Sequence, residues 1–268
     1  MELLVTPPAE HLSLEAARLR EHPDGGRRFP DGEVYVRLPP LEGPVALVHA
    51  GQPAPNEGLA YLYGALAALR ERGHTVRLVF TYTPYCRQDR AFEAGTLNYA
   101  RAMLRDLADC VERIYAVDPH FAHREWVEGV PVERIRALPA LRDAVGMEEY
   151  AVVGPDLGAV QRFGLRGFRK QRGGGEVSLT GDLNVAGENV LVFDDMIATG
   201  GTMVAARERL LEQGAATVRA AAVHGVLESG VERVREAFDG LYLTNSIADR
   251  GGEVRVEPLV RAALEVEE

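Results

Sequence analysis

Two adjacent carboxylates and a turn of small residues occur together in the stretch 189–202, N-V-L-V-F-D-D-M-I-A-T-G-G-T. The apolar run 190–193 predicts a short strand buried on both faces, and Asp194 and Asp195 follow it directly. After the turn, apolar positions at helical spacing predict a helix over 204–213. Glycines let backbone N–H groups approach an anion, and the helix N-terminus adds the positive end of its dipole. Strand, turn and helix together predict a phosphate cradle.

The carboxylates indicate what else the ligand carries. Asp194 and Asp195 would repel a phosphate, so they address another part of the ligand, and the vicinal hydroxyls of a sugar or a magnesium ion are the candidates. This favours a pentose phosphate. The alternative is an ordinary strand–turn–helix with acidic caps. The stretch is not a Walker A loop, because the pattern G-x-x-x-x-G-K-[ST] is absent.

Two loops carry dense polar side chains. In 29–33, F-P-D-G-E, two acids flank a glycine, and a solvated turn is the simplest interpretation. The stretch 84–90, P-Y-C-R-Q-D-R, follows the predicted strand 76–82. Its two arginines, glutamine and aspartate suit recognition of a planar base and phosphates, whereas a helix cap with surface ion pairs is the alternative.

Two further polar groups follow predicted strands. The stretch 117–120, V-D-P-H, places a carboxylate and the imidazole of His120 just past a strand, although a lone histidine is often structural. The stretch 153–158, V-G-P-D-L-G, is again a strand that ends in an acid, Asp156, flanked by glycines.

Strands and helices alternate along the chain, which predicts an α/β fold with mostly parallel sheets. The predicted strands are 45–49, 76–82, 113–117, 151–153, 190–193, 217–223 and 241–244. The predicted helices are 56–72, 97–107, 204–213 and 231–237. The pattern restarts near 139–150, so we expect two tandem domains, 1–144 and 145–268. Ligand sites are expected at the carboxyl ends of the strands, where the polar groups lie.

Composition excludes several classes of function. The 268 residues are 46% hydrophobic and 26% charged, with no apolar run near the roughly 20 residues of a membrane span. The net charge of −10 argues against nucleic acid or an anionic membrane as a partner. The N-terminus has neither a basic start nor a sustained apolar region, so a cytoplasmic protein is expected. Two cysteines are too few for a disulfide scaffold or a zinc site.

Taken together, the motifs resemble one family over nearly the whole chain. They occur in the order found in ribose-phosphate pyrophosphokinases: F-P-D-G-E, Y-C-R-Q-D-R, V-D-P-H, G-P-D-L-G, K-Q-R and D-D-M-I-A-T-G-G-T. The resemblance implies two phosphoribosyltransferase-like domains, each a mostly parallel sheet flanked by helices. It also implies transfer of the β,γ-pyrophosphoryl group of ATP to ribose 5-phosphate with Mg²⁺, in a homo-oligomer.

The resemblance also implies a role for each site residue. On the ATP side are Asp31, Gly32 and Glu33, reaching a neighbouring subunit, with Arg87 and Gln88 on the nucleotide. His120 and Asp156 match the metal positions, and Lys170 with Arg172 matches the catalytic pair on a mobile loop. The ribose 5-phosphate site comprises Asp194, Asp195, Ala198, Thr199, Gly200, Gly201 and Thr202. Lys170 is the only lysine beside 29 arginines, so its coincidence with a catalytic position is informative.

Departures from the family pattern keep two alternatives open. Ala198 stands where an aspartate is more frequent, and the segment between Asp156 and Lys170 is short for the helix and strand expected there. A non-catalytic or regulatory member of the family is therefore one alternative. A phosphoribosyltransferase is the other, although it leaves the motifs of the first half without a role.

Overall fold

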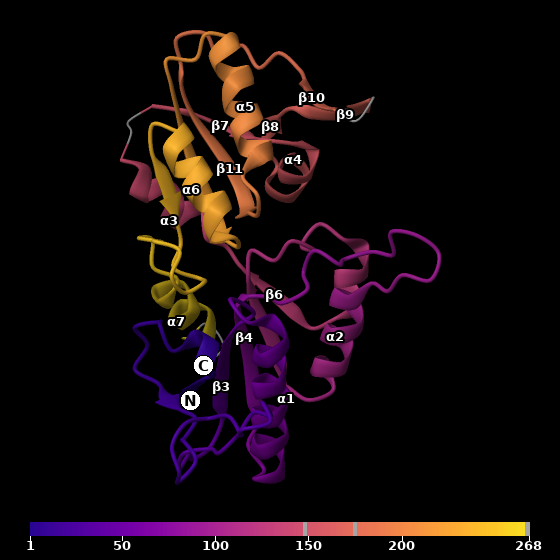
Figure 1. Ribbon diagram of the computed structural model, residues 1–268, viewed down its shortest axis with the longest axis vertical. Coiled ribbons are helices and arrows are strands. Elements are labelled where there is room, and N and C mark those ends of the chain that lie inside the picture. The colour runs from indigo at the N-terminus through magenta and orange to yellow at the C-terminus, as the bar shows by residue number, and fades with distance from the viewer. Residues whose placement is uncertain (147–148, 174–175, 266–268) are drawn as a thin grey trace. The chain divides into compact units, whose positions relative to one another are not determined.

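The computed structural model describes residues 1–146, 149–173 and 176–265, and over 169–180 it describes the backbone alone. Two compact units make up the described chain. Unit 1 comprises 1–136, 246–248 and the C-terminal segment from 256, and unit 2 comprises 137–245 and 249–255. Figure 1 shows the helices and strands of both units by colour along the chain. None of the helices in the described ranges is long and apolar enough to cross a bilayer.

Unit 1 contains a parallel sheet with the strand order β2-β1-β3-β4-β5-β6 among its described residues. The strands are β1 (Glu2–Val5), β2 (Ala17–Arg18), β3 (Val45–Ala50), β4 (Val76–Tyr82), β5 (Arg113–Val117) and β6 (Val132–Ile135). The helices are α1 (Pro55–Glu71), α2 (Tyr99–Ala108) and α7 (Glu257–Glu265), with 3₁₀ turns η1 (Pro7–Ala9) and η2 (Glu125–Gly129). All six residues of β3 are buried, as expected of a central strand covered on both faces.

Unit 2 contains a second parallel sheet, ordered β13-β12-β11-β7-β8 in the part of the chain that is described. Its strands are β7 (Ala151–Gly154), β8 (Arg166–Gly167), β11 (Asn189–Ile197), β12 (Thr217–Gly225) and β13 (Leu241–Leu243). An antiparallel hairpin, β9 (Arg169–Gly173) with β10 (Glu176–Thr180), forms a separate sheet. The helices are α3 (Leu138–Val145), α4 (Leu157–Phe163), α5 (Gly201–Glu212) and α6 (Glu228–Ala237), and α5 packs beside α6 (Figure 1).

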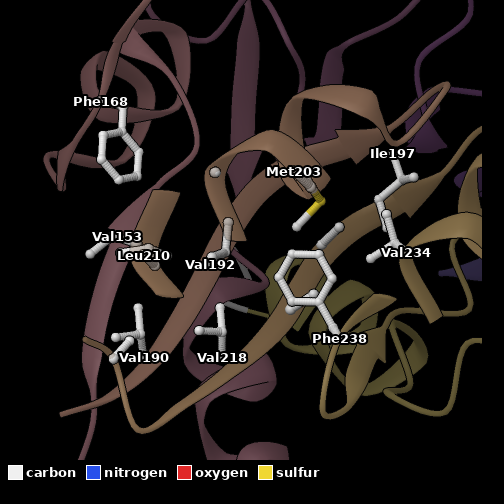
Figure 2. Packing of buried hydrophobic residues seen from close by; sticks show 14 of the residues in the cluster. Val153, Phe168, Val190, Val192, Ile197, Met203, Leu210, Val218, Val234 and Phe238 are labelled. Atoms are coloured by element: carbon white, nitrogen blue, oxygen red, sulfur yellow. The ribbon is translucent and has the colours of Figure 1, made fainter. Parts of the chain in front are cut away.

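The core of unit 2 lies between its sheet and the helices α5 and α6. Val192 of β11, Met203 of α5 and Val234 of α6 belong to one buried cluster, shown in Figure 2. The helical spacing of Met203, Ala206 and Leu210 places all three in this cluster, and Gly214 follows the helix with a φ of +84°. The cluster fixes α5 against β11, and these two elements flank the predicted phosphate turn.

The division between the units differs from the predicted boundary at 144/145. It falls after Arg136, because α3 packs on β12 and β13 of unit 2. The predicted second domain also loses its C-terminal end, because α7 packs on β6 of unit 1. The division is set by helices that pack on strands distant in the sequence. It cannot be read from a change in the local sequence pattern.

Candidate functional site

The strand that leads into the predicted phosphate cradle is longer than the sequence indicated. The prediction ended it before the two carboxylates, but β11 continues through Asp194 and Asp195 to Ile197. Both acids are buried, and Asp195 is fully so. The predicted strand 190–193 thus stopped short of the two carboxylates. They belong to the carboxyl-terminal half of a central strand.

Arg162 of α4 is the reason that two buried carboxylates can stand side by side. Its guanidinium Nη2 lies 2.9 Å from Oδ1 of Asp194 and 2.7 Å from Oδ1 of Asp195. Its side chain is itself only 5% exposed. One cation is thus shared by two anions away from water, an arrangement that holds both side chains in fixed positions.

The group formed by Arg162, Asp194 and Asp195 carries an excess of negative charge. Burial, together with the neighbouring Asp195, raises the pKa of Asp194 well above its ordinary value, although Arg162 opposes the shift. For Arg162, burial lowers the pKa, but the two carboxylates outweigh it and the net direction is upward. The group therefore stays short of positive charge, and hydroxyl donors of a ligand would relieve that shortage.

The turn after β11 has the backbone that an anion site needs. Gly200 is the N-cap of α5 with a φ of +76°, and no side chain caps the helix there. The first N–H groups of a helix have no partner within the helix, so those at the start of α5 are suited to donate hydrogen bonds to phosphate oxygens. The predicted residues Ala198, Thr199, Gly200, Gly201 and Thr202 all lie in this turn or in the first residues of α5.

Gly230 of α6 packs directly against the backbone of the turn. A Cβ at this position would overlap the carbonyl oxygen of Ala198, so only glycine lets α6 approach so closely. In return, a Cβ on Gly200 would come within 2.8 Å of the Gly230 carbonyl oxygen. Backbone packs directly on backbone here, which leaves the turn little freedom to shift.

Asp156 lies at the N-terminus of α4, the helix that carries Arg162. Its Oδ1 accepts a hydrogen bond from the backbone N–H of Ala159 at 3.1 Å, which makes it the N-cap. The helix α4 and the strand β8 that follows it occupy the interval before Lys170. The inference that this interval is too short for a helix and a strand is therefore wrong.

Lys170 and Arg172 lie in β9, where they pair in register with Leu179 and Val177 of β10. The prediction placed them in a loop, and the backbone of 169–173 and 176–180 is instead a hairpin. Their side chains, like residues 174–175, lie outside the described part of the structure.

In unit 1, residues 85–90 follow β4 and present alternating buried and exposed positions. Cys86 and Asp89 are buried, while Arg87, Gln88 and Arg90 are exposed. The Asp89 carboxylate accepts two hydrogen bonds from Arg124, at 2.7 Å to Nε and 3.1 Å to Nη2. Asp89, the third residue of the R-Q-D-R group, and its partner Arg124 are structural, and the other three side chains are exposed.

The turn 29–33 is confirmed as a turn. The Asp31 carboxylate accepts a hydrogen bond from the Glu33 N–H at 3.1 Å, and Gly32 has a φ of +95°. Asp31, Gly32 and Glu33 are exposed, whereas Phe29 packs edge-on against His22 and Tyr35. This turn was expected to precede the first strand of its domain, but β1 and β2 come before it.

The V-D-P-H stretch also contains one buried structural residue and one residue that can face a ligand. Asp118 is buried with a φ of +30°, and its Oδ1 accepts a hydrogen bond from Nε of Arg134 at 2.6 Å. His120 is half-buried just beyond the end of β5. Only His120 of this pair is placed to meet a ligand.

Within unit 2, Asp194, Asp195 and the turn 198–202 form one site at the carboxyl end of β11. Within unit 1, Arg87 and Gln88 follow β4 and His120 follows β5, which are neighbouring strands. Sequence reasoning missed Arg162 and Arg124, whose partners lie 32 and 35 residues away in the chain. Their only local signal is an arginine in an amphipathic turn, which is common on any surface.

Comparison with known proteins agrees with this geometry. The family model described as phosphoribosyl transferase domain matches residues 150–251, which contain most of unit 2. A ribose-phosphate pyrophosphokinase of Methanopyrus kandleri is 34% identical over 96% of this chain and 93% of its own length. That of Thermococcus kodakarensis is 35% identical over 87% of this chain and 88% of its own.

The crystal structure of phosphoribosylpyrophosphate synthetase from Mycobacterium smegmatis matches at a TM-score of 0.76. It is 25% identical, and the match covers 99% of this chain and 100% of that one. The resemblance inferred from six motifs is confirmed, as is the α/β fold with two parallel sheets. The chain is an enzyme of the ribose-phosphate pyrophosphokinase family.

Proposed function

We propose that this enzyme transfers the β,γ-pyrophosphoryl group of ATP to the anomeric hydroxyl of ribose 5-phosphate, releasing AMP. One observation carries the proposal: unit 2 has an uncapped helix N-terminus after two buried carboxylates, and unit 1 has a separate, anchored segment with exposed arginines. A reaction between a nucleotide and a sugar phosphate uses both, whereas a transfer to a free base leaves the second without a role.

In unit 2, the first N–H groups of α5 bind the 5-phosphate, with Thr199 and Thr202 as additional hydroxyl donors. Asp194 and Asp195 accept hydrogen bonds from the ribose hydroxyls. Because Arg162 already fixes both carboxylates, little conformational entropy is lost when the sugar binds.

In unit 1, Arg87 and Gln88 contact the nucleotide, where a guanidinium matches phosphate oxygens and an amide matches the edge of a base. Lys170 and Arg172 supply positive charge to the transferred group during the reaction. They are two residues apart on β9. Little covalent work falls to the protein in such a transfer, so cations and in-line positioning dominate catalysis.

Magnesium is the proposed cofactor, and His120 in unit 1 and Asp156 in unit 2 are each a proposed ligand position within its own unit. Among the described residues no group of three or more potential ligand side chains could hold a metal ion. Asp156 uses one oxygen in the α4 cap and keeps acceptor capacity, which fits a magnesium ion that substrate phosphates complete. When bound, magnesium neutralises charge on the phosphate oxygens.

One assay tests this function. Incubation with ATP, magnesium and ribose 5-phosphate should yield AMP. A second incubation, of phosphoribosyl pyrophosphate with purine or pyrimidine bases, should yield no nucleotide. Nucleotide without AMP would favour a phosphoribosyltransferase, and neither product would favour a non-catalytic member. The main support for that last alternative, a missing helix and strand before Lys170, is gone, since α4 and β8 are present.

We further propose a homo-oligomer in which Asp31, Gly32 and Glu33 serve the ATP site of a neighbouring copy. Their exposure in a turn with φ of +95° at Gly32 supports this. Mixing an Asp31→Ala/Glu33→Ala variant with Lys170→Ala should restore part of the activity, because hybrid sites would contain one intact set of residues. A fully active monomer would contradict this. The expected cytoplasmic location stays a prediction.

A further inference from the structure

The segment 85–90 of unit 1 is held at several positions by packing and hydrogen bonds. The Tyr85 ring stacks on Tyr99 with centroids 4.2 Å apart, and Cys86 is 1% exposed. The backbone carbonyl of Gln88 accepts a hydrogen bond from the Ala100 N–H at 3.1 Å. The side chains of Arg87, Gln88 and Arg90 lie between these anchors and are exposed.

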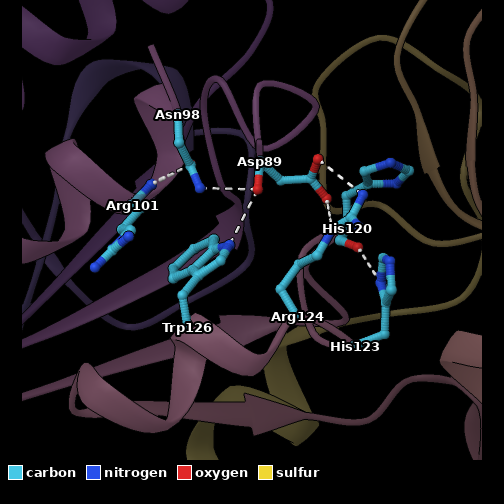
Figure 3. A network of polar contacts seen from close by, with 7 residues as sticks. All are labelled: Asp89, Asn98, Arg101, His120, His123, Arg124 and Trp126. Carbon is cyan, nitrogen blue, oxygen red and sulfur yellow. Dashed lines mark hydrogen bonds and ion pairs between the residues drawn. The ribbon is translucent and has the colours of Figure 1, made fainter. Parts of the chain in front are cut away.

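Asp89 is the most heavily held residue of this segment (Figure 3). Its carboxylate, 2% exposed, receives the two hydrogen bonds from Arg124. Its backbone carbonyl accepts two more, from Asn98 Nδ2 at 2.9 Å and from Trp126 Nε1 at 3.0 Å. A bidentate guanidinium–carboxylate pair away from water is strong and directional, so it fixes orientation as well as distance.

The partners of Asp89 come from two different parts of unit 1. Asn98 is the N-cap of α2, accepting from the Arg101 N–H at 3.0 Å. Arg124 ends the turn that contains His120, with the Phe121 carbonyl accepting from the Arg124 N–H at 2.8 Å. The ion pair therefore joins the segment after β4 to the segment after β5, the two that carry Arg87, Gln88 and His120.

We propose that Asp89 and Arg124 are positioning residues, whose ion pair fixes the backbone that presents Arg87 and Gln88 to ATP. The inference rests on the proposed function. Asp89 is buried, and its carboxylate binds Nε and Nη2 of Arg124, so the pair acts on ATP through the segment that it holds. Loss of the pair lets the 87–90 segment adopt other conformations, and ATP must then select the competent one.

Calorimetric titration with Mg·ATP and, separately, with ribose 5-phosphate tests the proposal without requiring turnover. Asp89→Asn and Arg124→Met should each weaken ATP binding about tenfold, and the double variant should be no weaker than either alone. Ribose 5-phosphate affinity should stay within about twofold of the parent's. Arg124→Lys should recover part of the ATP affinity, because one of the two contacts remains possible.

A second cycle separates positioning from a general structural role. In an Arg87→Ala/Gln88→Ala background, Asp89→Asn should have almost no further effect on the remaining ATP affinity, because both side chains that it positions are gone. Arg113→Met is the matched control, since Arg113 also forms an ion pair in unit 1, with Glu133, at the amino end of β5. It should leave both affinities unchanged.

The outcomes are distinct. A parent protein that binds no ATP overturns the proposed function, and this inference with it. A parent that binds ATP, with folded Asp89→Asn and Arg124→Met variants that bind it equally well, overturns the inference alone. Equal loss of both ligands also overturns it. If Arg124→Met does not fold, Asp89→Asn decides, because it conserves volume and Arg124 is 28% exposed.

Discussion

The two half-sites are constructed in opposite ways. The sugar-phosphate half-site in unit 2 is one continuous segment, 194–202. Its carboxylates are buried, and its hydrogen-bond donors to an anion are backbone N–H groups. The nucleotide half-site in unit 1 consists of exposed side chains on segments after β4 and β5, which are held by residues that do not face the ligand. Substitutions should therefore act differently in the two. In unit 2 they should disturb the site and the fold together, and in unit 1 an exposed residue should change binding alone.

The largest effect is expected at Arg162, where site and core coincide. Arg162→Met leaves two buried carboxylates without their cation and should lower the free energy of unfolding of unit 2 by about 3–5 kcal/mol. Trp126, the only tryptophan, lies in unit 1, so its fluorescence follows that unit while circular dichroism follows both. Chemical denaturation should show the dichroism transition shifted and the fluorescence transition retained.

Arg166→Met is the control for that comparison. Arg166 pairs with Glu188 at 3.2 Å, and both side chains are nearly half exposed. Its loss should change stability by less than about 1 kcal/mol. Equal effects of the two substitutions would mean that the Arg162 group contributes no more than a surface pair.

Substitution of Lys170 should lower the rate of the transfer and leave ligand binding at both half-sites unchanged. Lys170→Ala should lower kcat by about a hundredfold or more, roughly 3 kcal/mol of transition-state stabilisation, with little change in the affinity for either substrate. Lys170→Arg should recover only part, because a planar guanidinium does not replace a compact ammonium. Steady-state kinetics for both substrates provide the measurement, with Gln171→Ala as the neighbouring control. Parent-like turnover in both Lys170 variants would exclude a catalytic role.

Gly230 tests whether the phosphate turn depends on close backbone packing. Gly230→Ala should displace the turn at Ala198, costing about 1–3 kcal/mol and weakening ribose 5-phosphate binding by about tenfold, with ATP binding unchanged. Gly240→Ala is the control in the same unit, since a Cβ there meets nothing closer than 3.7 Å. Calorimetry on the two variants should separate them clearly; similar affinities would show that the turn tolerates displacement.

Asp194 should give the smallest effect, with opposite signs for binding and stability. Asp194→Asn should weaken ribose 5-phosphate binding about tenfold and leave ATP binding unchanged. Burial raises the pKa of Asp194, so its ionised form costs stability at a pH above the folded-state pKa. The variant should therefore be more stable than the parent at neutral pH.

The pH dependence of the stability difference between Asp194→Asn and the parent tests whether ionisation of Asp194 is its cause. The stability difference between Asp194→Asn and the parent should shrink as the pH falls toward the ordinary carboxyl value of 3.8, where the parent's Asp194 is protonated too. Thermal unfolding across this range is the measurement. A variant that is less stable than the parent at neutral pH would contradict the assigned cost, and an unchanged sugar affinity would remove Asp194 from the site.

The same contrast explains what the sequence revealed. The strands β4 and β5 have the bounds predicted from their apolar positions, and the cradle was recognisable because its residues are contiguous. The extension of β11 through Asp194 was not, because acids normally end an apolar strand and the cation that permits them is 32 residues away. The strand β6, V-E-R-I, is short and half charged, so it carries no apolar run. Long-range ion pairs have no local pattern.

The return of the chain to unit 1 has a consequence for synthesis. Residues 256–265, made after all of unit 2, complete unit 1: α7 packs on β6, and the Glu257 carboxylate accepts from the Ser13 N–H at 2.8 Å. Ser246 accepts from the Thr81 hydroxyl at 2.9 Å in the same unit. On the ribosome, unit 2 thus has its whole sequence available before unit 1 does. The nucleotide half-site, although encoded first, is the last to acquire its finished scaffold.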